Sequence, residues 1–133
     1  MDLSSDQFKV ALSNTAPGSE TPNVPTADGN GIIGNVTEID YSNFQNGLTT
    51  GLNITTTSST QTGGTYKLVL ADLTLTATGV IPAFQYVYIY DDTVGSPAKP
   101  LVGYYDYGST VNLGSGDTFT IDFSEANGVL QLT

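Results

Sequence analysis

The chain has 133 residues, a formal net charge of −10, and no histidine, cysteine or tryptophan. A chain of this length forms one domain, and the missing residue types exclude catalytic triads built on them, disulfides and the usual zinc sites. Its only cations are Lys9, Lys67 and Lys99. They are too few for the phosphate contacts on which nucleic-acid binding depends, and the negative charge also disfavours an anionic membrane surface.

The first 35 residues combine a short apolar segment with a stretch rich in proline and glycine. Residues 8–12 predict one short strand, whereas residues 13–35 hold three prolines and four glycines, which oppose both helix and regular sheet. We therefore expect residues 1–35 to form a strand and an extended arm, and residues 36–133 to form the globular domain. No signal peptide or membrane span is expected, because residues 1–6 lack a basic and an apolar region and no apolar run approaches ~20 residues.

The middle of the chain alternates between apolar and polar residues. Residues 41–47 are compatible with one helical turn, and residues 52–57 predict a half-buried strand. Residues 65–78 predict one long strand, because every odd position from 69 to 77 is apolar. Even positions are apolar only in the first half, so one face is expected to be buried throughout. The half-exposed apolar face formed by Tyr66, Leu68 and Leu70 is a candidate for packing in a subunit interface.

The remaining strands are rich in aromatic residues. Residues 84–90 predict a strand that carries Phe84, Tyr86, Tyr88 and Tyr90 on one face. Residues 101–107 predict another strand. Residues 111–113 and 118–123 flank a glycine-rich turn, which predicts a hairpin. Asn127-Gly128 predicts a further hairpin turn, followed by a last strand over 129–132 that pairs in the sheet.

About eight strands thus follow one another at spacings near ten residues, with no helix between them. This pattern is typical of an all-β fold, an antiparallel β-sandwich. A jelly-roll-like and an immunoglobulin-like arrangement both remain open, because the pattern does not define the strand order.

Few residues offer catalytic or metal-binding chemistry. Asp91, Asp92 and Asp106 lie near the ends of aromatic strands, where two carboxylates can hydrolyse a glycoside or Asp91 and Asp92 can join a cation site. The favoured interpretation is that they hydrogen-bond the backbone in turns. Residues 28–31 resemble the opening of an EF-hand loop, but isoleucines stand at its fifth, sixth and twelfth positions. We predict a protein that is not an enzyme and has no cofactor or metal.

Eight tyrosines in a chain without tryptophan favour a protein interface, because tyrosine is enriched there. Packing within the sandwich and stacking on carbohydrate are the alternatives. The candidate interface residues are Phe8, Val10, Leu12, Val24, Tyr66, Tyr86, Tyr88, Tyr104, Tyr105 and Tyr107.

Several segments resemble small β-rich structural proteins of tailed bacteriophages. They are residues 9–15 (KVALSNT), 64–72 (GTYKLVLAD), 84–93 (FQYVYIYDDT), 99–108 (KPLVGYYDYG) and 116–123 (GDTFTIDF), followed by 128–130 (GVL). Within that group the chain is most similar to capsid decoration, or cement, proteins, and the resemblance spans most of residues 8–132.

The resemblance implies an all-β homotrimer that binds major capsid protein on the outer surface of the virion. It implies synthesis in the cytoplasm of a host bacterium and no nucleic-acid or membrane partner. An acidic chain without arginine suits the exterior of a capsid better than its DNA-facing interior. The alternative is another virion component, a head fibre, neck protein or tail adhesin that binds a host surface glycan.

Overall fold

The computed structural model describes residues 3–16, 33–45, 52–95, 99–123 and 130–132. This part of the chain is all-β, with antiparallel pairing between every two neighbouring strands, which confirms the predicted fold class. Most of the predicted arm, including Val24, lies outside the described residues. The elements are β1 (Phe8–Ser13), the 3-10 helix η1 (Ile33–Asn35), β2 (Asn53–Ile54), β3 (Thr56–Thr62), β4 (Thr65–Leu70), β5 (Leu73–Thr76), β6 (Phe84–Asp91), β7 (Leu101–Val111), β8 (Thr118–Ile121) and β9 (Leu130–Leu132).

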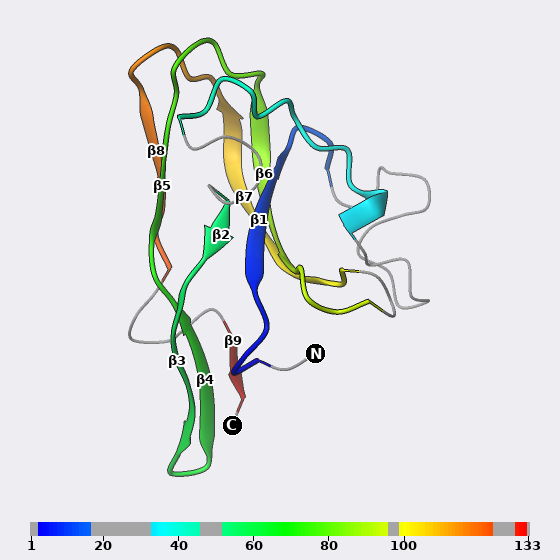
Figure 1. The fold of residues 1–133 in the computed structure, drawn as a ribbon, viewed down its shortest axis with the longest axis vertical. Coiled ribbons are helices and arrows are strands. Elements are labelled where there is room, and N and C mark those ends of the chain that lie inside the picture. Colours follow the sequence, from blue (N-terminus) through cyan, green and yellow to red (C-terminus); the bar gives the residue numbers. More distant parts are fainter. Residues whose placement is uncertain (1–2, 17–32, 46–51, 96–98, 124–129, 133) are drawn as a thin grey trace.

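The strands form three sheets in a sandwich-like arrangement. The largest has four strands in the order β2-β1-β6-β7, and the others have the orders β3-β4-β9 and β5-β8. The β5-β8 ribbon lies at one side of the large sheet, and the β3-β4 hairpin extends from the lower end of the molecule (Figure 1). The last strand, β9, pairs with β4, which confirms that the C-terminal segment joins a sheet. In the described part of the chain, no helix is long and apolar enough to cross a membrane.

Strands β1 and β6 of the four-stranded sheet are covered on both faces. One face packs into the main core, to which β1 contributes Phe8, Val10 and Leu12. The opposite face carries Tyr88 and Tyr90, which pack in a smaller apolar cluster with Ala11, Val36 and, from η1, Ile33. Burial on both faces explains why the segment of β6 is apolar without interruption from Tyr86 to Tyr90.

Phe84 departs from the predicted aromatic row. The pairing of β6 with β7 shifts register between Phe84 and Tyr86, and such a bulge reverses the direction in which the next side chain points. Phe84 consequently packs in the main core with Val87, while Tyr86 packs against the cluster on the other face. The prediction of one continuous row is correct for the three tyrosines and wrong for Phe84.

The predicted long strand over residues 65–78 is two strands in different sheets. In β4 the buried residues are at even positions, Leu68 and Leu70. From β5 onward they are at odd positions, Leu75 and Ala77. The buried face therefore changes from even to odd positions. The change occurs between β4 and β5, where Asp72 Oδ1 accepts a hydrogen bond of 2.8 Å from the backbone N–H of Phe123. One face buried throughout is therefore wrong, because the chain leaves one sheet and enters another.

Two predicted local elements also differ. Over the described residues 41–45, the structure has a tight turn in place of the expected helical turn. A hydrogen bond from the Phe44 N–H to the Tyr41 carbonyl closes it, and Phe44 also forms an isolated β-bridge with Ala77. The glycine-rich turn at residues 114–117 is confirmed by the hydrogen bond from Asp117 N to Gly114 O at 3.0 Å. It does not close a hairpin, because β8 pairs with β5 rather than with β7. The turn predicted at Asn127-Gly128 lies outside the described residues.

Candidate functional site

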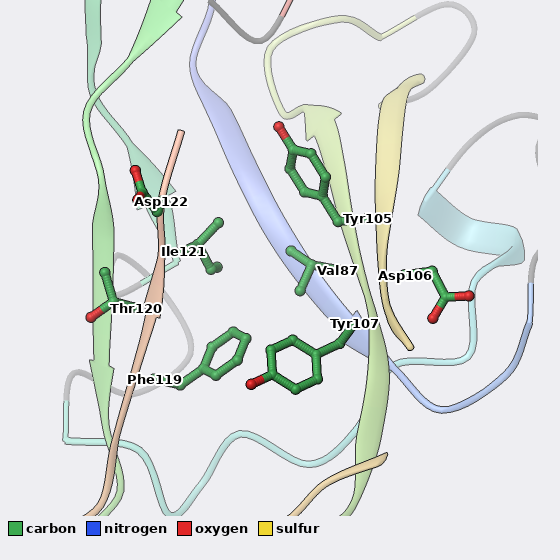
Figure 2. Close-up of a pocket in the computed structure, with 8 residues that line it drawn as sticks. All are labelled: Val87, Tyr105, Asp106, Tyr107, Phe119, Thr120, Ile121 and Asp122. Carbon is green, nitrogen blue, oxygen red and sulfur yellow. The ribbon is translucent and has the colours of Figure 1, made fainter. Parts of the chain in front are cut away.

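A groove of about 170 Å³ opens between β7 and β8 (Figure 2). It is lined by Val87, Tyr105, Asp106, Tyr107, Phe119, Thr120, Ile121 and Asp122. Strand β7 is an edge of the four-stranded sheet, and β8 pairs only with β5 among the described strands. The groove therefore lies between the edges of two sheets, and residues of the main core form part of its lining.

The alternation of side chains along each strand explains which residues line the groove. Tyr105 and Tyr107 extend from β7 toward β8, and Phe119 and Ile121 extend from β8 toward β7 (Figure 2). Positions two apart on a strand share a face. Val87 on β6 lies between the two walls in the same view and belongs to the main core.

Aromatic contacts connect the exposed wall to the interior. The rings of Tyr107 and Phe119 meet edge to face with centroids 5.9 Å apart, and Phe119 meets Phe84 in the same way at 5.1 Å. The ring of Tyr105 lies 6.2 Å from that of Phe123. Tyr107 is nevertheless 62% exposed and Tyr105 43% exposed. The tyrosine rings of the groove thus pack against interior rings on one side and are open to solvent on the other.

The charged residues of the lining are both acidic. The Asp106 carboxylate points away from the groove (Figure 2) and accepts hydrogen bonds from Gln85 Nε2 at 3.0 Å and from Gly108 N at 2.8 Å. These bonds hold the pKa of Asp106 below its ordinary value of 3.8. Burial raises the pKa of the Tyr105 hydroxyl, so that ring stays neutral at physiological pH. The Asp122 side chain is exposed, but it points from β8 to the side away from Tyr105 and Tyr107 (Figure 2), and none of the lysines lines the groove.

Four predicted interface residues are buried inside the chain. Phe8, Val10, Leu12 and Tyr88 have no solvent-exposed surface. Strand β1 lies between β2 and β6, and both of its faces are covered. This corrects the expectation that these side chains contact a partner, because the fold itself uses them as core.

The other predicted residues divide between core and surface. Tyr66 is half-buried, and its hydroxyl lies 2.6 Å from Ser59 Oγ. The apolar face predicted around Tyr66 is therefore largely internal, since Leu68 and Leu70 are in the main core. Tyr86 is also half-buried, against the smaller cluster.

Three tyrosines of β7 remain exposed. The structure brings Tyr105 and Tyr107 together in the groove. Tyr104, which neighbours Tyr105 in the strand and so points to the opposite face, packs its ring 6.0 Å from that of Tyr88. Among the predicted interface residues whose placement is described, two therefore contribute to this site.

The wall supplied by β8 was not among the sequence predictions. Phe119 and Ile121 alternate visibly in residues 118–123, but alternation identifies a strand face without identifying what lies opposite. Their position across from Tyr105 and Tyr107 depends on the pairing of β8 with β5. The available signal was the alternation of Phe119 and Ile121 with the polar residues Thr118, Thr120 and Asp122.

The aspartates considered for catalysis do not form a pair. Asp91 is fully buried at the end of β6, where its Oδ1 accepts a 2.9 Å hydrogen bond from Thr93 N. Asp106 on β7 pairs with Tyr86 on β6. Tyr86 lies five residues before Asp91 in the same strand, so Asp106 is roughly 16 Å from Asp91 at ~3.3 Å per residue. A glycosidase pair is separated by about 5–9.5 Å.

Asp92 has a different partner. Its Oδ1 lies 3.0 Å from Lys99 Nζ in an ion pair at the surface. Among the residues whose placement is described, no group of three acidic, histidine or cysteine side chains is arranged to hold a metal ion. Asp91 therefore hydrogen-bonds the backbone of a turn, as aspartate commonly does, and Asp92 forms an ion pair.

Comparison of the chain with protein-family models, curated proteins and solved structures finds no significant match.

Proposed function

We propose that this chain is a virion structural protein, a capsid decoration protein that binds the outer surface of a phage head and stabilises contacts between major capsid proteins. The single observation that carries the proposal is the β7–β8 groove, an exposed aromatic surface at two sheet edges of an acidic all-β chain. Exposed tyrosine at such a surface favours protein contact. The proposed protein acts by non-covalent contacts, as a homotrimer, without catalysis or a cofactor.

The charge of the chain supports a partner with a basic surface. With a formal net charge of −10, the chain is attracted to positively charged protein surfaces and repelled by DNA. This is the electrostatic arrangement expected of a protein added to the outside of a filled head.

The proposal is tested with heads of the parent phage assembled without this chain. Purified protein is expected to be a trimer by light scattering and to sediment with the heads in saturable amounts. It is also expected to raise their melting temperature in calorimetry. A chain that stays monomeric and leaves the melting of the heads unchanged contradicts the proposal.

A specific observation favours a second candidate, an adhesin of the head fibre, neck or tail that binds a host glycan. Tyr107 is the most exposed tyrosine, and it lines the groove. An exposed tyrosine can stack its ring on a sugar and bind a sugar hydroxyl group through its own hydroxyl. Saturable binding to a glycan array that Tyr107→Ala abolishes and Tyr104→Ala preserves would support this candidate, as would low copy number per particle.

A further inference from the structure

We propose that the β7–β8 groove binds an extended, lysine- or arginine-bearing protein segment, which adds as a strand to the free edge of β7 and seats one apolar side chain between the walls of the groove. The inference rests on the proposed function only in taking the partner to be a protein. It names the surface that makes the contact and the chemistry of the segment that it accepts.

The first argument is the free edge of β7. This strand pairs with β6 on one side, and no strand in the described part of the chain pairs with its other side. An unpaired edge exposes backbone N–H and C=O groups to any extended chain. Pairing with β6 is regular from Gly103 to Asp106. These four residues include neither lysine nor proline, and their charged residue, Asp106, repels acidic segments and attracts basic ones.

The end of β7 limits where a strand can be added. Gly108 has a φ of 86°, and the register with β6 shifts between the Tyr86–Asp106 and Phe84–Val111 pairs. A bulge of this kind twists an edge away from a neighbouring strand. The added segment is therefore short and pairs with residues 103–106.

The second argument is the size and lining of the groove. Its volume of about 170 Å³ is well below the ~300–1,000 Å³ of typical small-molecule sites. Phe119 and Ile121 form an apolar wall opposite Tyr105 and Tyr107 (Figure 2). Since side chains alternate along a strand, a bound segment directs one apolar side chain into the groove and its neighbours outward.

The third argument is charge. The Asp106 carboxylate lies on the outward face of β7 (Figure 2), where the neighbours of the apolar anchor also point, and its two hydrogen bonds hold its pKa below the ordinary value. The lining contains no cation. The exposed ring of Tyr107 can also accept a cation on its face. The neighbours of the apolar anchor are therefore expected to be lysine or arginine.

The test titrates the isotopically labelled full chain with a capped peptide of alternating lysine and valine and follows the backbone amides by NMR. Saturable shifts are expected at residues 103–106 and 119–122. A peptide of alternating glutamate and valine, and the lysine peptide with N-methylated valines, should each bind about tenfold more weakly or worse, because they lose the charge and the strand pairing respectively. Equal binding of the N-methylated peptide, or shifts confined to other strands, would overturn the inference.

A charge-matched pair of variants tests the acidic side chain of β7. Asp106→Lys changes the net charge by two units and is expected to weaken binding of the lysine–valine peptide about tenfold or more. The control is the double variant Gln61→Lys, Thr62→Lys, which makes the same change in net charge at the exposed end of the β3-β4 hairpin (Figure 1) and should leave peptide binding unchanged. Equal weakening by both variants would show that only net charge matters and would overturn the groove as the site.

Binding to heads separates this inference from the proposed function. Heads that bind the native chain but not Asp106→Lys support both. Heads that bind the two equally leave the decoration role standing and overturn the groove as the contact surface. A native chain that ignores heads but binds the lysine–valine peptide at β7 contradicts the decoration role alone. Shifts at residues 103–106 and 119–122 with a host glycan, and none with the peptide, also overturn the inference.

Discussion

At the scale of single residues, Tyr41 supplies a hydrogen-bond partner to the backbone of β1 at Leu12, beyond the residues of β1 that pair with β2. Its hydroxyl accepts a 2.8 Å hydrogen bond from the Leu12 N–H and donates one of 2.7 Å to Glu38 Oε1. The neighbouring Leu12 carbonyl accepts from the Ile39 N–H at 3.0 Å. Burial and the adjacent Glu38 carboxylate raise the pKa of the Tyr41 hydroxyl strongly, so it remains a neutral donor. Strand β2 is too short to pair with all of β1, and Tyr41 replaces the missing strand at this point.

Replacing Tyr41 with phenylalanine should therefore destabilise the fold. The Leu12 N–H would be left buried without a partner, at a cost of about 1–3 kcal/mol in the free energy of unfolding. Denaturant unfolding of Tyr41→Phe measures this cost. Tyr104→Phe removes a hydroxyl from an exposed tyrosine and should change stability little. Equal stability of the two variants would contradict the role assigned to Tyr41.

Asp91 makes the fold sensitive to pH. Burial raises the pKa of this carboxyl above its ordinary value of 3.8, and the neighbouring Asp6 raises it further, while the hydrogen bond from Thr93 N acts in the opposite direction. The folded chain thus binds this proton more tightly than the unfolded chain does. The stability that the proton contributes is fully present below pH 3.8 and is lost as the pH rises through the raised pKa.

Asp91→Asn should consequently show a smaller loss of unfolding free energy than the native chain between about pH 4 and about pH 7. Asparagine keeps the oxygen that accepts from Thr93 N and carries no charge. Asp106→Asn is the control of opposite sign. The pKa of Asp106 is lowered, so its carboxylate stabilises the fold above pH 3.8 and this contribution disappears at lower pH. Denaturant unfolding from about pH 2 to about pH 7 covers both contributions, and parallel curves for Asp91→Asn and the native chain would contradict the role of Asp91.

At the scale of elements, the β3-β4 hairpin depends on its two-residue turn. Gly63 and Gly64 have φ values of 59° and 84°, between Thr62 and Thr65, which pair directly. Positive φ at both positions is the geometry that hairpin turns with a tight two-residue loop require. No atom lies within 4 Å of a Cβ placed at either glycine, so the requirement comes from the backbone alone.

Gly64→Ala should therefore cost about 1–2 kcal/mol of unfolding free energy, and Gly63→Asn should cost less, because asparagine tolerates this conformation. Gly95→Ala is the matched control. It also has open space around its Cβ, and its φ lies outside the left-handed region. Thermal or denaturant unfolding compares the three variants. A loss at Gly95 as large as that at Gly64 would show that the φ angle is not the cause.

At the scale of the whole molecule, the excess of negative charge acts on folding and on binding in opposite directions. A formal net charge of −10 produces self-repulsion within the folded chain and attraction toward a basic partner. Salt screens both, since the Debye length falls from about 10 Å at 0.1 M to about 3 Å at 1 M.

Raising the salt concentration over that range should therefore increase the melting temperature of the isolated chain while weakening its binding to heads and to the lysine–valine peptide. Calorimetry and sedimentation on the same samples measure the two effects. Binding that is unchanged by salt would contradict a contact guided by charge.

Much of the strand content was predictable because it is a local property. The segments of β1, β6 and the C-terminal strand were identified from their apolar runs, and the alternation of Leu52 and Ile54 marked a half-buried strand. The bulge at Phe84 and the change of buried face between Leu70 and Leu75 were not predictable in the same way. Each depends on register with a distant strand, and a shift of one residue reverses every side chain that follows.

The sequence by itself determined the all-β class of this protein and the chemistry that it lacks, because composition and period-two alternation are properties of the chain alone. The tertiary structure alone decided which apolar residues are core and which are surface. It buried Phe8, Val10, Leu12 and Tyr88 and left Tyr105 and Tyr107 exposed at an edge. The physical reason is that alternation shows which side chains share a face, whereas strand order decides which faces are covered and which edges stay free.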